Sequence, residues 1–397
     1  MTEKKMAGRN SNIELLRIFA MMGVVILHYN NPQMGGAFGF VKEGSTSYFL
    51  LYILESISIC AVDLFIMISG YFMCDSYHRS LIKPLKLLAQ VIAFKEAGAV
   101  LSLGLGIMSG TGAFSIKDIA GQLLSAAVPN NYFVILYIAI YLLSAYMNLA
   151  IKALDANGMR RLLILLMALF SLWPTGVDVF SGLTNTEWIG LSTVGIDGDQ
   201  GGYTVVNFAL MYFAGAYLRK MPQKEYSVKK ILLIYIFDIG AITLWALSSQ
   251  AEYLDISGSA WIYCNPLVIL SAMLIFVMFK QLPEWNNRLI NSAAKGCFTV
   301  FLGHTFFLPY IGVQKFCSMP WVVVMLHIFA SCVVIYGICW ILYLIYEKIS
   351  SCVFHRLEKW DVLSESIICN KKPGGGMGNR NLAYSILKID ERPLGLV

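Results

Sequence analysis

Three ionisable residues lie on one stripe of an otherwise apolar segment near the start of the chain. Glu14, Arg17 and His28 fall within the segment from Ile13 to Tyr29. In a helix, Arg17 and His28 are about three turns apart, so they share a face and lie about 16 Å apart along the axis. Ionisable groups are costly in a membrane-spanning helix and usually line a cavity or a pathway. We therefore interpret the stripe as a polar track along a spanning helix.

These residue types suit acyl transfer. A neutral imidazole is a general base at cellular pH, so His28 is our candidate for removing a hydroxyl proton as an acyl carbon is attacked. Arg17 would hold an anionic group or orient His28 through Glu14. The alternatives are an interhelical hydrogen bond for His28 and, for Arg17, a side chain that snorkels to the cytoplasmic interface.

The composition is that of a membrane protein. Of the 397 residues, 57% are hydrophobic and 14% are charged, and the mean hydropathy is +0.65. Soluble proteins carry about 25% charged residues. A span needs about 20 apolar residues, and ten segments approach or exceed that length. They are residues 12–30, 48–74, 81–108, 132–151, 161–175, 203–218, 231–248, 262–279, 297–312 and 321–347. We expect an all-α, polytopic membrane protein with about ten transmembrane helices.

Basic residues predict the orientation. If successive spans cross the membrane in alternating directions, most of the 30 Lys and Arg residues fall in loops on the same side as the N-terminus. Because cytoplasmic loops retain Lys and Arg, both termini are predicted to be cytoplasmic. The net charge of +6 reflects this bias and the surface of the lipid bilayer, and it is no evidence for a nucleic acid partner.

Other sequence features predict neither a metal nor a nucleotide site. The nine cysteines are scattered without a CxxC pair, so no disulfide framework or metal site is expected. We expect no cleavable signal, and we divide the chain into a membrane domain (1–349) and a cytoplasmic tail (350–397). The tail is partly flexible because of its Gly-rich run at 373–378, which lacks the Lys-Ser/Thr of a phosphate loop. Two outer segments, 175–202 and 249–261, are long enough to cover a site. Their acidic, aromatic and Gly-rich composition suits sugar hydroxyls, and it equally suits any solvated loop.

The second segment ends in a motif with one acid. Asp63 lies in an apolar run, where it binds substrate or pairs with a neighbouring helix. Further along, Ser69 and Gly70 permit close approach of a helix or ligand beside Tyr71.

A basic turn follows, with Arg79, Lys83 and Lys86. It is suited to clamp the phosphates of a cytoplasmic donor, and the positive-inside rule explains it equally well. Lys95 and Glu96 in the third segment predict a local break or satisfied charges.

With these motifs the chain resembles the membrane-bound acyltransferase family 3, the O-acyltransferases of bacterial surface polysaccharides. Arg17 to His28 is similar to the family's Arg-x10-His, and residues 62–72 resemble its Val-Asp-x-Phe…Ser-Gly-Tyr/Phe stretch. Residues 212–217 resemble its Gly-bearing sixth helix, and 297–304 resemble its late Tyr-Leu-x-His, which places His304 in the site.

The resemblance implies a cytoplasmic acetyl-CoA donor, no permanently bound cofactor, and a glycan hydroxyl as acceptor, usually on a lipid carrier. It implies a multi-pass protein of the bacterial plasma (inner) membrane in which His28 and Arg17 are essential. We assign Glu14, Arg17 and His28 to catalysis. The residues assigned to substrate binding are Asp63, Ser69, Tyr71, Arg79, Lys83, Lys86 and His304.

Two questions stay open at this point. His28 acts either as a general base or as a transient acyl carrier. The rival function is a transporter or flippase whose polar stripe lines a substrate path, and the absence of an internal sequence repeat weakens it. An antibiotic or a lipid is the alternative acceptor.

Overall fold

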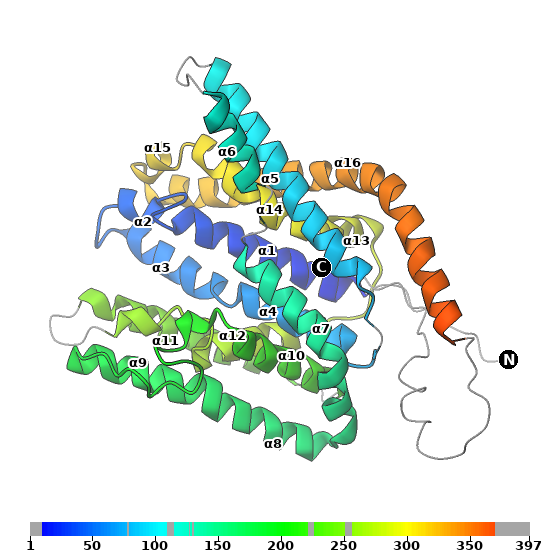
Figure 1. Ribbon diagram of the computed structural model, residues 1–397. Coiled ribbons are helices and arrows are strands. Elements are labelled where there is room, and N and C mark those ends of the chain that lie inside the picture. Colours follow the sequence, from blue (N-terminus) through cyan, green and yellow to red (C-terminus); the bar gives the residue numbers. More distant parts are fainter. Residues whose placement is uncertain are drawn as a thin grey trace.

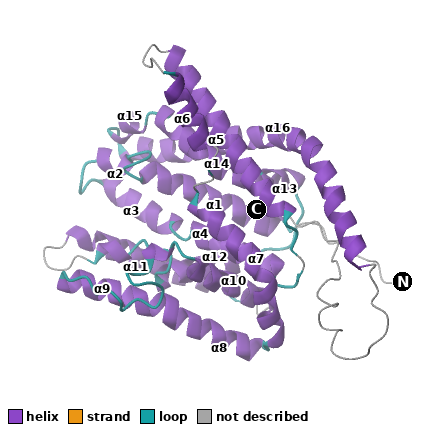
Figure 2. Cartoon of the chain, viewed as in Figure 1, coloured by secondary structure: helices purple, strands orange, loops and turns teal. Residues whose placement is uncertain are grey.

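Every regular element in the described part of the chain is helical (Figure 2), as predicted. The computed structural model describes residues 10–77, 79–108, 115–126, 128, 131–220, 226–250 and 256–369. The first helices are α1 (Ser11–Asn30), α2 (Ala37–Phe40), α3 (Thr46–Ser58), α4 (Ala61–Met73), α5 (Ile82–Met108), α6 (Ile116–Ala126), α7 (Tyr132–Ala153), α8 (Ala156–Met167) and α9 (Trp173–Thr184). The remaining helices are α10 (Val205–Lys220), α11 (Val228–Ala246), α12 (Pro266–Lys280), α13 (Arg288–Lys295), α14 (Cys297–Phe307), α15 (Val313–Cys317) and α16 (Trp321–Cys369).

Seven helical stretches within the described residues are long and apolar enough to cross a membrane. They are Ser11–Asn30, Thr46–Met73, Ile82–Met108, Tyr132–Ala153, Ala156–Thr184, Val228–Gln250 and Trp321–Cys352. The protein is therefore an all-α, polytopic membrane protein. The predicted spans 203–218, 262–279 and 297–312 coincide with the shorter helices α10, α12 and α14. The count of ten and the cytoplasmic side of the termini stay predictions.

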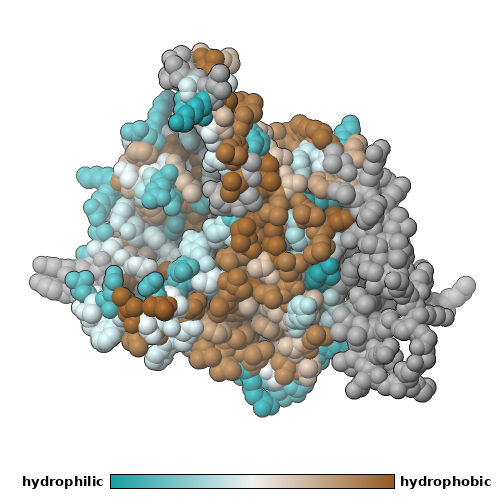
Figure 3. Space-filling model, viewed as in Figure 1, coloured by the Kyte–Doolittle hydropathy of each residue, from teal (hydrophilic) through white to brown (hydrophobic). Residues whose placement is uncertain are grey.

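The first helix lies in the interior of the bundle (Figure 1). In its most apolar stretch 72% of α1 is buried, and 67% of the joined α3–α4 stretch, against 12% for α5. The neighbours of α1 include α3, α4, α13, α14 and α16. Apolar side chains cover the middle of the face drawn in Figure 3, where α5 and α7 lie. The polar stripe of α1 therefore faces protein, and the apolar outer helices are left to face lipid.

Side-chain hydrogen bonds hold the start of α1 in place. Asn10 caps the helix by accepting from the N–H of Asn12 at 3.0 Å. The Asn12 amide in turn donates to the carbonyls of Leu282 (2.9 Å) and Pro283 (3.0 Å) between α12 and α13. The opposite end of α1 contacts α2, which packs against α15. Arg17 and His28 are therefore near opposite ends of the bundle.

Two predicted segments differ from what the sequence led us to expect. The predicted segment 161–175 is longer than expected, because a π-helical turn (Ala168–Leu172) joins α8 to α9. Pro174 follows this turn, and the wider turn accommodates the residue that cannot continue the normal hydrogen-bond ladder. Lys95 does not break α5, because its ammonium donates to the carbonyls of Ser125 (3.3 Å) and Val128 (2.5 Å). Of the two alternatives, the local break is wrong, and the satisfied charge is confirmed for Lys95.

The predicted boundary at 349/350 falls inside α16, which continues to Cys369. The Gly-rich run at 373–378 lies outside the described residues, so its predicted flexibility is not addressed.

Helices α4 and α10 pack with their backbones almost in contact. A Cβ on Gly70 would overlap the carbonyl oxygen of Tyr212, and a Cβ on Gly215 would overlap that of Met67. Small residues permit this approach between membrane helices. The predicted role of Gly70 in close helix approach is confirmed, and its partner helix is α10.

We expect Gly70→Ala and Gly215→Ala to lower the thermal midpoint of the detergent-solubilised protein, because overpacking costs about 1–3 kcal/mol. Gly240→Ala is the matched control: a Cβ there meets nothing within 4 Å, and Ala is favoured over Gly in a helix by about 1 kcal/mol. Equal midpoints for all three variants would contradict the close crossing of α4 and α10.

Candidate active site

The stripe predicted on α1 exists and lies inside the bundle. Arg17, Met21, Val24 and His28 follow one another at spacings of four, three and four residues, which keeps them on one face. The two outer members are polar and the two inner members are apolar. The face therefore has two polar ends separated by a short apolar stretch.

The end of the stripe nearer the start of α1 is a buried ion pair. Arg17 Nη1 lies 2.9 Å from Glu14 Oε2, and the two side chains are only 5% and 4% exposed. Arg17 therefore does not snorkel to the interface. Its Nε is buried and has no hydrogen-bond partner among the described residues, so one charged donor is left for a further acceptor.

At the other end of the stripe, two histidines form a pair. His28 Nδ1 is hydrogen-bonded to Nε2 of His304, and the two rings lie edge to edge with centroids 4.6 Å apart and planes 19° from parallel. His304 is 1% exposed, and its Nδ1 lies 2.8 Å from the carbonyl of Val300. His28 is half-buried. Because His28 is oriented by His304, and the Glu14–Arg17 pair lies about 16 Å away along the helix, Glu14 does not orient His28 as we had allowed.

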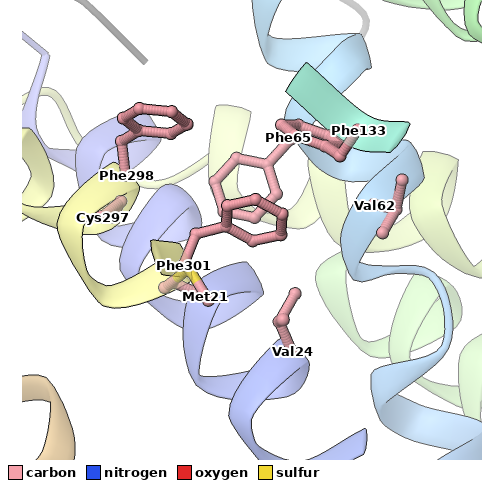
Figure 4. Close-up of a pocket in the computed structure, with 8 residues that line it drawn as sticks. All are labelled: Met21, Val24, Val62, Phe65, Phe133, Cys297, Phe298 and Phe301. Atoms are coloured by element: carbon pink, nitrogen blue, oxygen red, sulfur yellow. The ribbon is translucent and has the colours of Figure 1, made fainter. Parts of the chain in front are cut away.

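An apolar cavity lies between these two polar ends (Figure 4). It is narrow, with an enclosed volume of about 10 Å³, which is room for about one water molecule. Four helices, α1, α4, α7 and α14, contribute its lining residues, which are Met21, Val24, Val62, Phe65, Phe133, Cys297, Phe298 and Phe301. We call this cavity the slot.

Aromatic contacts link the slot to the histidine pair. The ring of Phe301 lies 5.1 Å from Phe133 across the slot and 6.3 Å from His304 along α14. Cys297, Phe301 and His304 are spaced four and three residues apart, so α14 presents a stripe that matches the one on α1. The slot is therefore closed on two sides by helices that carry the two histidines.

Asp63 does not line the slot. It is fully buried, and its Oδ1 accepts from the Asn207 amide of α10 at 3.3 Å. Its other oxygen has no hydrogen-bond partner within the described residues. The contact is the helix–helix pairing that we considered as the alternative, and a role for Asp63 in substrate binding stays a prediction.

Ser69 lies on the side of α4 that lines the slot, one turn beyond Phe65. Its hydroxyl donates to the Phe65 carbonyl at 3.0 Å. Tyr137 of α7 lies beside the Ser69 hydroxyl. Sequence patterns did not single it out, because α7 reads as uniformly apolar there.

Tyr71 belongs to a separate cluster of cations. The guanidinium of Arg219 lies 5.1 Å from the centre of its ring and the ammonium of Lys280 lies 5.8 Å away. Such contacts hold a cation beside an aromatic face. The structure does not bring Tyr71 to the slot.

The guanidinium of Arg79 is held by acceptors of the protein. Its Nε donates to the Ser144 hydroxyl at 2.6 Å and to the Tyr141 carbonyl at 3.1 Å, and Nη1 donates to the Ser76 hydroxyl at 3.2 Å. These bonds attach the turn before α5 to α7. Donor binding by Arg79 stays a prediction, but the contacts favour a structural role.

Lys83 and Lys86 lie in the first turns of α5 and are half-buried. The ammonium of Lys86 lies 5.5 Å from the ring centre of Phe354 on α16. The start of α5 lies at the same end of the bundle as the start of α1 (Figure 1). The two lysines are therefore near the Arg17 end of the slot rather than the histidine end.

A third histidine supports the site, although we saw no such role in the sequence. The Tyr29 hydroxyl lies 2.7 Å from His327 Nδ1, and His327 Nε2 lies 3.0 Å from the Ile311 carbonyl. These bonds fix the end of α1 next to His28. The partners are far apart along the chain, so no local sequence pattern predicts these hydrogen bonds.

The two long outer segments lie away from the slot. Asp199 of the acidic segment 175–202 bonds Cys264 at 2.7 Å, and Trp173 donates to the Leu191 carbonyl at 2.7 Å. In the segment 249–261, Trp261 donates to Ser56 of α3 at 3.1 Å, and residues 251–255 lie outside the described part. Neither segment contributes a lining residue. Within the described residues, no three His, Cys, Asp or Glu side chains are grouped to hold a metal.

The arrangement of a buried cation, an apolar slot and a histidine pair suits transfer of an acyl group along α1. The acyltransferase domain family matches residues 10–344, which is most of the chain. The protein belongs to acyltransferase family 3. It is thus a membrane acyltransferase, and the matched region contains both stripes and the slot. No curated protein and no solved structure matches the chain.

We expect Val24→Phe to lower acyl transfer by this family 3 acyltransferase at least tenfold, because the added ring fills the slot. Overpacking costs about 1–3 kcal/mol of stability, so rates are compared per folded molecule after size-exclusion chromatography. Val333→Phe is the matched control, since Val333 is 61% exposed on the outside of α16. A folded Val24→Phe protein with the wild-type rate would exclude the slot from the substrate path.

Proposed function

We propose that this acyltransferase moves an acetyl group from cytoplasmic acetyl-CoA to a hydroxyl of a surface polysaccharide or its lipid-linked precursor. The observation that supports the proposal is the histidine pair at one end of an apolar slot whose other end is the buried Arg17. An O-acetyltransferase of this kind would belong to the plasma membrane of a bacterium.

The Arg17 end of the slot suits the donor. Coenzyme A is a polyanion, and Lys83 and Lys86 supply positive charge at this end of the bundle. The charge of Arg17 is balanced by Glu14, so Arg17 offers its Nε–H as a donor. The arm that carries its thioester is thin and less polar than its phosphates, which suits the apolar lining of the slot. Entry of the arm requires the rings of Phe133 and Phe301, whose centres are 5.1 Å apart, to separate. The thioester would then reach the histidines while the nucleotide stays in the cytoplasm.

Two chemical routes remain for His28. As a general base, His28 takes the proton of the acceptor hydroxyl, the oxygen bonds to the acetyl carbon, and the carbon–sulfur bond breaks. The thiolate then takes the proton from His28. As an acyl carrier, the imidazole nitrogen bonds first to the acetyl carbon as the carbon–sulfur bond breaks and the thiolate leaves. The acceptor oxygen then bonds to the acetyl carbon, the carbon–nitrogen bond to His28 breaks, and the hydroxyl proton passes to the thiolate.

We expect His28→Ala to abolish O-acetylation while the protein remains folded and inserted, since one interhelical hydrogen bond contributes only about 1–2 kcal/mol in membranes. The readout is the O-acetyl content of surface polysaccharide from a strain that lacks the gene and carries the variant. Thr305→Ala, at an exposed position of α14 outside the slot, is the control. Wild-type acetylation with His28→Ala would remove His28 from catalysis. Reduced polysaccharide with an unchanged acetyl content per sugar would indicate a transporter.

We expect Lys83→Gln with Lys86→Gln to raise the KM for acetyl-CoA by about three- to tenfold, which corresponds to about 0.7–1.4 kcal/mol. This is the range for partly solvated phosphate contacts. Arg79→Gln is the comparison, and it should lower the thermal midpoint with little effect on this KM because its donors are used within the protein. An unchanged KM in the correctly inserted double variant would move the donor phosphates to the Arg160–Arg161 or Arg288–Lys295 region.

A further inference from the structure

The hydrogen bonds of His304 determine which nitrogen of each histidine carries a proton. A neutral imidazole has one N–H donor and one nitrogen lone pair. The Val300 carbonyl only accepts, so His304 Nδ1, 2.8 Å away, must be the nitrogen that carries hydrogen. In neutral His304 the other nitrogen, Nε2, is then an acceptor.

The partner of that acceptor is His28. Since His304 Nε2 accepts, His28 Nδ1 must donate to it. A neutral His28 therefore has its lone pair on Nε2, the nitrogen for which no hydrogen-bond partner is found among the described residues. This is the less common tautomer of histidine in water, so the contact selects it.

A charged His304 would reverse this assignment, and its surroundings oppose it. The side chain is 1% exposed, and its two hydrogen-bond partners are a backbone carbonyl and a neutral ring. A buried cation without an acidic partner is strongly disfavoured. The neutral form of His304 is the one that its site accommodates.

We propose that His304 is a positioning residue that holds His28 in the Nδ1–H tautomer, so that Nε2 of His28 is the atom that reacts. The proposal rests on the proposed function for the reaction itself. In the general-base route, His28 Nε2 takes the hydroxyl proton, and His304 continues to accept from Nδ1–H of the resulting imidazolium. The proton then leaves from Nε2 to the thiolate, which restores the starting tautomer. In the acyl-carrier route the same nitrogen bonds to the acetyl carbon.

The same role is played in serine hydrolases by a carboxylate that accepts from the histidine. A neutral imidazole performs it here without placing a second charge beside the apolar slot. The two rings are nearly coplanar, as a hydrogen bond between ring nitrogens requires, and this contact restricts rotation of the His28 ring.

The kinetic test compares two replacements of His304. His304→Gln keeps an acceptor oxygen near the position of Nε2, whereas His304→Leu removes the acceptor. We expect His304→Leu to lower kcat by about 100-fold or more, with the KM for acetyl-CoA within about threefold of the wild type. We expect His304→Gln to recover at least about tenfold of that loss. Thr305→Leu, which places the same side chain at the neighbouring, exposed position of α14, is the control.

The direct test is the tautomer itself. Nitrogen-15 solid-state NMR of histidine-labelled full-length protein in bilayers distinguishes Nδ1–H from Nε2–H, and a His28→Asn sample assigns the signal among the five histidines. We expect the Nδ1–H form of His28 in the wild type and in His304→Gln, and its loss in His304→Leu. If His304→Leu does not fold, the wild-type spectrum and the His304→Gln variant still decide.

An Nε2–H tautomer of His28 in the wild type would overturn the proposal, as would equal kcat values for folded His304→Gln and His304→Leu. A wild-type protein that shows the Nδ1–H tautomer but does not use acetyl-CoA would refute the proposed donor and leave the positioning role intact.

Discussion

Each polar group that α1 carries through the bundle has to find its partner on the protein, because the hydrocarbon of a membrane offers none. Glu14 and Arg17 satisfy each other at 2.9 Å. Further along, His28 reaches His304 of α14, and the Asn30 amide donates to Glu55 of α3 at 2.7 Å. These contacts require α1 to be surrounded by other helices, and they explain why it is among the most buried helices of the described chain.

The wall of the slot depends on a second constraint, the close packing of α4 on α10. Val62 and Phe65 face the slot from α4, and the same helix approaches α10 through Gly70. Backbones in near contact cannot shift without a clash, so α10 supports the wall from behind. The slot thus lies between one helix positioned by hydrogen bonds, α1, and one positioned by glycine packing, α4.

The distribution of charge around the slot shows why a basic residue is not by itself a ligand site. Arg79 belongs to the basic turn that sequence marks as a phosphate clamp, yet its guanidinium is occupied by a hydroxyl and a carbonyl of α7. Arg17 is buried in an apolar helix and still has a donor nitrogen without a partner among the described residues. Which cation is available depends on the neighbouring backbone, not on the number of charges in a loop.

The sequence by itself determined the class and much of the site. Composition identified a helical membrane protein. So much apolar surface, with so few charged residues, is stable only within a lipid bilayer. The helical period alone placed Arg17 and His28 on one face, since that relation is local to one helix. The tertiary structure decided which residues complete that face. His28 and His304 are 276 residues apart, and His327, Tyr137 and the carbonyl partners of Arg79 come from separate helices. In lipid all apolar helix faces are nearly equivalent, so pairing depends on small residues and single hydrogen bonds that only the packed bundle reveals.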